Sequence, residues 1–267
     1  MNTSIEARHD EYPLLQHCDK GEYGMSTQLL IPRGGSLINK GHCIQAATTS
    51  TGNVARTVFA LHDKWRGVIS KIYHLGENEV THINIMLMPM NKDQTYIETE
   101  SKEGIEEVTA LNTSIGEMLE TIAKDAEVKR NGVLYRLQRK VFYKNGNNWT
   151  CELIARIEQD EVILRRDNIS HDQFIFAART GDIIAHSNSR IDKKTFKLIR
   201  DNTYSVTLEA AGETYNSSRN IDFNHVFFVA AHGDQITTTS ATHVIDYKFC
   251  DEKPSNSEAF DIYLAVS

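Results

Sequence analysis

The chain has little cysteine and proline, with four of each among 267 residues. The cysteines, at positions 18, 43, 151 and 250, form no Cys-x-x-Cys pair and have no regular spacing. This excludes a cysteine-based zinc knuckle and argues against a disulfide framework. A chain of this length buries enough surface to fold without disulfides or metal. We interpret the cysteines as free thiols in a reducing compartment.

Long apolar runs are also missing. The best run, Val226–Ala231, is far too short to cross a bilayer, and the first eighteen residues lack the apolar centre of a signal peptide. The formal net charge is -7, which argues against a nucleic-acid-binding surface because such surfaces concentrate lysine and arginine. We therefore expect a cytoplasmic protein with no membrane span and no nucleic-acid partner.

Short β-like segments follow one another at intervals typical of antiparallel sheets. In Val80–Met88, for example, Thr81, Ile83, Ile85 and Leu87 share one largely apolar face. Other predicted strands include 43–47, 173–177 and 225–231. No internal repeat is evident in the sequence.

One segment has a helical pattern instead. Its apolar residues fall at positions 105, 108, 111, 115, 118, 122 and 126, and glutamates precede and follow its start. This spacing predicts an amphipathic helix over about 104–129. Its apolar stripe is a candidate surface for self-association, formed by Val108, Leu111, Ile115, Met118 and Ile122.

These patterns predict a mainly β (α+β) fold with antiparallel, sandwich-like sheets in two halves and one central helix. We expect an irregular segment at 1–25, a β-rich half at 26–103, the helix at 104–130 and a second β-rich half at 131–267. The two halves could also be one continuous domain.

A first candidate site is the run Tyr96–Lys102, in which Glu98, Glu100 and Lys102 alternate. On a strand these three side chains share a face. The pattern resembles the Glu-x-Glu-x-Lys motif of tunnel triphosphatases. That resemblance implies a divalent metal ion on the carboxylates and a phosphate on the lysine. The later residues Arg136 and Arg139 would then be phosphate contacts.

A second candidate site lies between His225 and Cys250. The apolar run ending in His-Gly-Asp resembles the histidine-bearing strand of caspase-like cysteine proteases, which implies a thiol nucleophile at Cys250. If 225–232 and 243–250 form a simple hairpin, however, His232 and Cys250 lie on opposite faces and roughly 23 Å apart. The same register brings His232, Asp234 and His243 together, a set able to bind Zn²⁺ or another divalent ion.

Neither pattern forms a complete catalytic set. We therefore expect a binding or self-assembling protein without a cofactor, whose partner is a second copy of itself or another protein. The alternatives are a metal-dependent phosphohydrolase and, last, a cysteine hydrolase.

Overall fold

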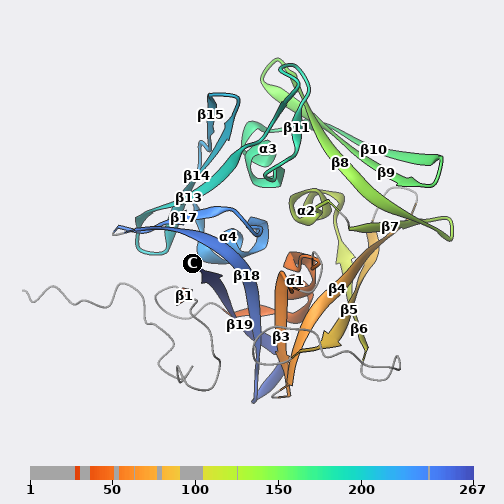
Figure 1. The fold of residues 1–267 in the computed structure, drawn as a ribbon, viewed down its shortest axis with the longest axis vertical. Helices are drawn as coiled ribbons and strands as arrows, with labels where there is room; N and C mark the ends of the chain where they lie inside the picture. Colours follow the sequence, from red (N-terminus) through yellow and green to blue (C-terminus); the bar gives the residue numbers. More distant parts are fainter. Residues whose placement is uncertain are drawn as a thin grey trace, which may run out of the picture.

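The computed structural model describes residues 28–30, 37–50, 54–62, 64–76, 80–90, 105–124, 126–239 and 241–267. Four short helices lie together near the centre of the molecule, and strands surround them (Figure 1). The helices are α1 (Lys40–Ala46), α2 (Ile115–Thr121), α3 (His171–Ala177) and α4 (Phe223–Val229).

The described strands form one large mixed sheet around these helices. They are β1 (Gln28–Leu30), β2 (Leu37–Asn39), β3 (Thr57–Leu61), β4 (Lys64–Leu75), β5 (Val80–Pro89), β6 (Glu106–Thr113), β7 (Glu127–Arg130), β8 (Val133–Asn145), β9 (Asn148–Ile157), β10 (Asp160–Ile169), β11 (Ile183–Ile184), β12 (Ser189–Arg190), β13 (Lys193–Arg200), β14 (Thr203–Ala210), β15 (Glu213–Asn216), β16 (Ile221–Asp222), β17 (Gln235–Thr237), β18 (Thr242–Lys253) and β19 (Asn256–Val266).

The structure contains a fourfold recurrence that the sequence patterns did not reveal. Each unit begins with a seven-residue helix, continues into a short strand and then forms a longer strand that carries a buried lysine. The four sets are α1, β3 and β4 with Lys71; α2, β7 and β8 with Lys140; α3, β11 and β13 with Lys194; and α4, β17 and β18 with Lys248.

The units close into a ring through parallel strand pairs. Each short strand pairs with the lysine-bearing strand of the preceding unit: β7 with β4, β11 with β8, and β17 with β13. The last strand pair joins the end of the chain to its beginning, because β3 of the first unit pairs in parallel with β18 of the fourth. The sheet is therefore continuous around the helices.

All four helices begin at a polar capping residue in extended conformation. Asn39, Ser114, Ser170 and Asp222 each accept a hydrogen bond from a backbone N–H of the first turn. Seven residues are too few for a stable isolated helix, so burial must supply the stability. The helices contribute largely buried side chains to the main core, among them Ile44, Met118, Phe174, Ile175 and Val226.

Three segments predicted as strands are helices. The segments 43–47, 173–177 and 225–231 largely coincide with α1, α3 and α4. Most side chains of these helices are buried, so the apolar residues run together without the helical spacing that an exposed face would produce. The capping patterns were the available signal, notably Ser170 with Gln173.

The predicted helix over about 104–129 is also wrong in its extent. Residues 106–113 form β6, which pairs antiparallel with β5, and only Ile115–Thr121 are helical. Ser114 caps α2 in a capping box with Glu117, so the helix starts about eleven residues later than predicted. The apolar residues of 105–126 resemble a helical pattern because β6 and α2, which follow one another in the chain, both direct apolar side chains toward the same core.

The mainly β class with a few helices is confirmed. Instead of two sandwich halves, the sheet surrounds four central helices (Figure 1). Within the described residues, no helix has the length and apolar character needed to span a membrane. The predicted irregular segment at 1–25 lies outside the described residues.

Candidate functional site

The four buried lysines bind the C-terminal ends of the helices. Lys194 donates to the carbonyl oxygens of Phe176 at 2.7 Å and Ala178 at 3.0 Å, at the end of α3, and of Val229 at 3.3 Å, at the end of α4. Lys140 makes the corresponding contacts to α2 and to Ala177 of α3. A lysine thus joins its own helix to that of the next unit.

Lys248 of the last unit makes the same kind of bridge between α4 and α1. Its Nζ donates to the carbonyl oxygen of Phe228 in α4 at 3.3 Å and to that of Ala46 in α1 at 2.8 Å. Lys71 donates to the carbonyl oxygens of Gln45 and Ala47 at the end of α1. These cations complement the negative ends of the helix dipoles.

A central arginine adds a further positive charge. Arg179 is buried and donates to the carbonyl oxygens of Val229 and Glu120, which joins α4 to α2. Asp182 and Asp234, both buried, occupy matching positions after α3 and α4 and accept from the backbone N–H of Arg179 and Ala231 at 2.8 Å each. Desolvation lowers the pKa of all four lysines and raises the pKa of both aspartates. This cluster is buried, and its lysines contact the helix ends, so we assign it a role in the fold. Arg179 Nε and Asp234 Oδ1 have no hydrogen-bond partner within the described residues.

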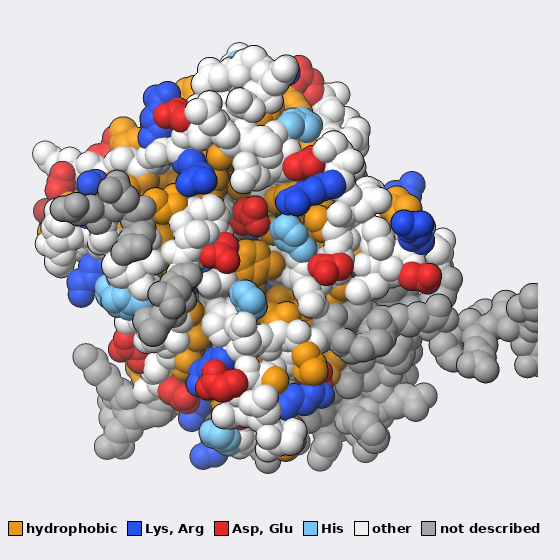
Figure 2. Space-filling model, turned by 180° about the vertical axis from the view of Figure 1, so that it is seen from behind, with side chains coloured by type: hydrophobic (Ala, Val, Ile, Leu, Met, Phe, Trp, Pro, Cys, Tyr) orange, Lys and Arg blue, Asp and Glu red, His pale blue; other side chains and the backbone are white. Residues whose placement is uncertain are grey.

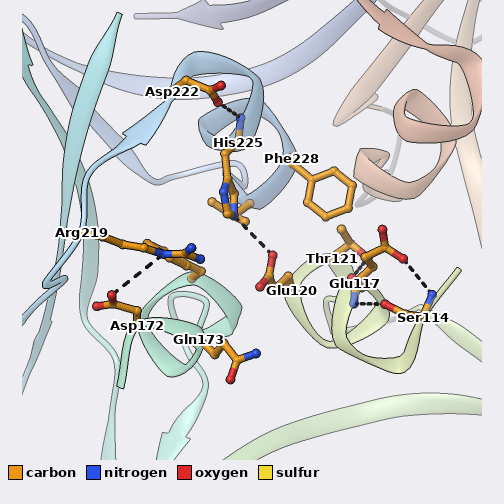
Figure 3. Close-up of polar contacts among 12 residues, drawn as sticks. Ser114, Glu117, Glu120, Thr121, Asp172, Gln173, Arg219, Asp222, His225 and Phe228 are labelled. Atoms are coloured by element: carbon orange, nitrogen blue, oxygen red, sulfur yellow. Dashed lines mark hydrogen bonds and ion pairs between the residues drawn. The ribbon is translucent and has the colours of Figure 1, made fainter. Parts of the chain in front are cut away.

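One face of the molecule shows histidines and carboxylates around hydrophobic side chains near its middle (Figure 2). Polar side chains from three helices also come together in the region drawn in Figure 3. Figure 3 shows His225 of α4 pointing toward Glu120 of α2, with Nε2 3.4 Å from Oε2. Arg219 lies beside Asp172 of α3 at 3.9 Å. The first contact joins α4 to α2, and the second joins α3 to the segment between β15 and β16.

The predicted histidine and aspartate cluster does not assemble. His232 is exposed, and its Nδ1 lies 3.0 Å from the carbonyl oxygen of Asp246. Asp234 is buried at the end of α4, while His243 pairs with Ile236 in the β17–β18 ladder. No group of three possible metal ligands occurs among the described residues. The assumed hairpin register fails because 225–229 is helical and β18 pairs instead with β17, β19 and β3.

Cys250 is completely buried in β18 and lies opposite Ile262 and Phe59. Its neighbour is Cys43 of α1, whose pKa is raised by burial and by the contact with Cys250. Burial also raises the pKa of Cys151 to about 12. A nucleophilic cysteine needs access and a stabilised thiolate, and Cys250 has no access to solvent.

The Glu98, Glu100 and Lys102 motif lies outside the described residues. Its proposed phosphate contacts, Arg136 and Arg139, are exposed on β8. Arg136 lies opposite Glu127 on one side and Arg156 on the other.

The predicted self-association stripe is not a single helical face. Val108 and Leu111 belong to β6, whereas Met118 and Ile122 are buried in the chain's own core at 1% and 0% exposure. Ile115, at the start of α2, is partly open. The buried members are unavailable to a second copy because they pack within the main core.

A different surface is open for association. β10 pairs with β9, and the other edge of β10 carries no strand among the described residues. At the middle of this edge strand lies Ile163, which is 51% exposed. Exposed edges with apolar side chains are templates for pairing with another strand.

An apolar groove with a cavity of about 230 Å³ runs beside this edge. Its walls include Ile115, Met118 and Leu119 of α2, together with Leu153 of β9 and Leu164 of β10. Three arginines, Arg130, Arg165 and Arg166, also line it. Arg165 pairs with Glu152 and Asp167, at 3.2 and 3.0 Å. Arg130 and Arg166 have no carboxylate partner within the described part of the chain.

Sequence reasoning missed this site because a short β-like segment does not by itself indicate which strand lies at the edge of a sheet. The available signal was the run Asp-Glu-Val-Ile-Leu-Arg-Arg at 160–166, in which two acidic and two basic residues flank three apolar ones. No protein-family model matches the chain, and no curated protein matches it either.

Proposed function

We propose that this protein is a non-enzymatic, self-associating binding protein that uses the β10 edge and the groove beside it. The observation that carries the proposal is the edge of the ten-residue strand β10, which pairs with no strand in the described part of the chain and has Ile163 exposed at its centre. Backbone donors and acceptors along such an edge bind another extended segment, and neighbouring apolar side chains add contact area.

The rest of the fold is suited to presenting the β10 edge to a binding partner. Parallel strand pairs and buried lysines hold the units in a closed ring, so the edge is carried on a rigid frame. Rigid frames reduce the conformational entropy that binding would otherwise cost. The candidate catalytic groups in the described residues are either buried, as Cys250 is, or separated, as His232 and His243 are.

Native mass spectrometry, recorded before and after treatment with a metal chelator, tests this proposal. We expect an oligomer, with a mass of two or more times the 30.3 kDa of one chain, and we expect the chelator to leave this mass unchanged. A monomer that carries a stoichiometric divalent ion, lost to the chelator, would instead support the phosphohydrolase alternative.

A matched pair of variants locates the surface. Ile163→Lys should weaken association because it places a charge at the centre of the edge. Ile199→Lys is the control. Ile199 is equally exposed, at 50%, but it lies on β13, which does not pair with β9 or β10. Equal effects of the two substitutions would show that the β10 edge is not the contact surface.

A further inference from the structure

The backbone groups that face outward from β10 follow from its hairpin with β9. Ile157 pairs with Asp160 across a two-residue turn, and the register continues regularly to Arg166 opposite Cys151. The two residues that flank a two-residue turn are joined by two backbone hydrogen bonds. Along an antiparallel ladder, such hydrogen-bonded pairs alternate with pairs that are not hydrogen-bonded to each other. Asp160, Val162, Leu164 and Arg166 therefore bond to β9. The N–H and C=O groups of Glu161, Ile163 and Arg165 point to the open edge.

The side chains of this strand are self-complementary. If a second β10 lies antiparallel with Ile163 opposite Ile163, Glu161 lies opposite Arg165 and Asp160 lies opposite Arg166. Val162 then lies opposite Leu164. Within the regular part of the strand, residues 160–166, each acidic residue meets a basic one and each apolar residue meets an apolar one.

Backbone and side chains select the same register. Pairs between Glu161 and Arg165, and between the two Ile163 residues, join outward-facing groups on both strands, as an antiparallel ladder requires. A one-residue shift would oppose outward groups to inward groups and lose these hydrogen bonds. A two-residue shift keeps the bonds but opposes Glu161 to Ile163. The register centred on Ile163 is therefore the one that pairs both charges and hydrogen bonds.

The two faces of the strand also fit their surroundings. Val162 and Leu164 pack against the main core, on the side where the strand partner residues Ala155 and Leu153 are buried. In a second copy, the same two side chains would lie over the groove beside Ile115. Asp160 of the second copy would bring a carboxylate to Arg166, whose side chain has no acidic partner in the described part of its own chain.

On the outer face the pairing extends an existing row of charges. Glu161 already binds Arg156, and Arg165 binds Glu152 at 3.2 Å. Adding Glu161 opposite Arg165 of the second copy produces an alternating row across the two sheets. Opposite charges at directly opposed positions stabilise strand pairing, and like charges oppose it.

We propose that two copies of this protein form a twofold-symmetric dimer by antiparallel β10–β10 pairing, with Ile163 on the axis. The arrangement is isologous, since each residue contact occurs twice. In this dimer, strands β8, β9 and β10 of one copy continue into β10, β9 and β8 of the other as one sheet. This inference rests on the proposed function and names its partner as a second copy of the chain.

Two charge reversals test the register. Glu161→Arg alone opposes arginine to arginine at both symmetric contacts, and Arg165→Glu alone opposes glutamate to glutamate. We expect each single variant to dimerise at least about tenfold more weakly than wild type. An equimolar mixture should recover a heterodimer, because each contact then joins an arginine to a glutamate. The double variant E161R/R165E should dimerise with itself.

Native mass spectrometry and sedimentation velocity measure these equilibria, and thermal unfolding of each variant confirms that it is folded. Arg139→Glu is the control, because Arg139 is exposed on β8 away from the edge. If wild type associates but the single variants and their mixture behave as wild type does, the register is wrong and the proposed self-association stands. If wild type is monomeric at all concentrations up to about 0.5 mM, both proposals fail.

Discussion

Replacement of Lys194 by methionine tests how the helix ends are held. Methionine keeps much of the side-chain length but cannot donate to the carbonyl oxygens of Phe176, Ala178 and Val229. All three oxygens lose the lysine, but Arg179 still donates to Val229, so Phe176 and Ala178 are the two left without a side-chain donor among the described residues. A buried acceptor left without a partner costs about 1–3 kcal/mol.

The substitution also removes a buried cation, and relief of desolvation offsets part of that loss. We expect the free energy of unfolding to fall by about 2–4 kcal/mol, measured by urea denaturation at neutral pH. Lys197→Met is the matched control, since Lys197 is exposed on the same strand. It should change stability by less than about 0.5 kcal/mol. A Lys194→Met protein as stable as wild type would refute the role assigned to this lysine.

The pH dependence of the same pair gives a second check. Burial lowers the pKa of Lys194 well below its ordinary value, so between the folded and unfolded pKa values the unfolded chain binds more protons. Wild type therefore gains stability relative to Lys194→Met as pH rises through this window toward the unfolded pKa of about 10.4. A difference that shrinks with rising pH would contradict the lowered pKa.

Four further expectations concern the core, a turn, the groove and the candidate motif. In the folded protein, Cys250 should resist iodoacetamide until denaturant is added, as peptide mass spectrometry would show; rapid labelling would reopen the cysteine hydrolase alternative. Gly233→Ala should lower the unfolding free energy by about 1 kcal/mol or more in a urea titration, because Gly233 has φ of 86°, and an unchanged midpoint would contradict this conformation. Ile115→Asp should cost about 2 kcal/mol, since it places a charge at the partly buried start of α2, and an unchanged melting temperature and mass would argue against this packing. Glu100→Ala should leave both stability and any phosphoester turnover of the purified protein unchanged, and a large loss of turnover would support the triphosphatase alternative.

The class of the fold was predictable because many strands carry alternating apolar residues. β5 is an example, since Ile83, Ile85 and Leu87 are all fully buried on one face. The helices were not predictable from periodicity, since α1, α3 and α4 are surrounded by sheet and each buries four of its seven residues. In these segments the caps Asn39, Ser170 and Asp222 carry more information than the apolar pattern.

The recurrence was hidden because its common features are sparse. Lys140, Lys194 and Lys248 are spaced 54 residues apart, yet Lys71 breaks this interval. Isolated lysines in strands usually indicate an exposed face. Their burial follows from the helix ends that they bind, which depends on contacts between distant parts of the chain. The open edge of β10 likewise depends on which strands pair, and a single sequence does not specify this.

A disulfide at the proposed twofold axis tests the central claim most directly. In the proposed register, residue 163 lies opposite itself in a hydrogen-bonded pair with a Cα–Cα distance of about 5.5 Å, which is compatible with a disulfide. Ile163→Cys should therefore form a covalent dimer under mild oxidation, seen on a non-reducing gel. Wild type and Ile199→Cys should form no covalent dimer under the same conditions and should migrate as monomers on this denaturing gel. Failure of Ile163→Cys to cross-link, while wild type still self-associates in solution, would contradict β10 pairing centred on Ile163.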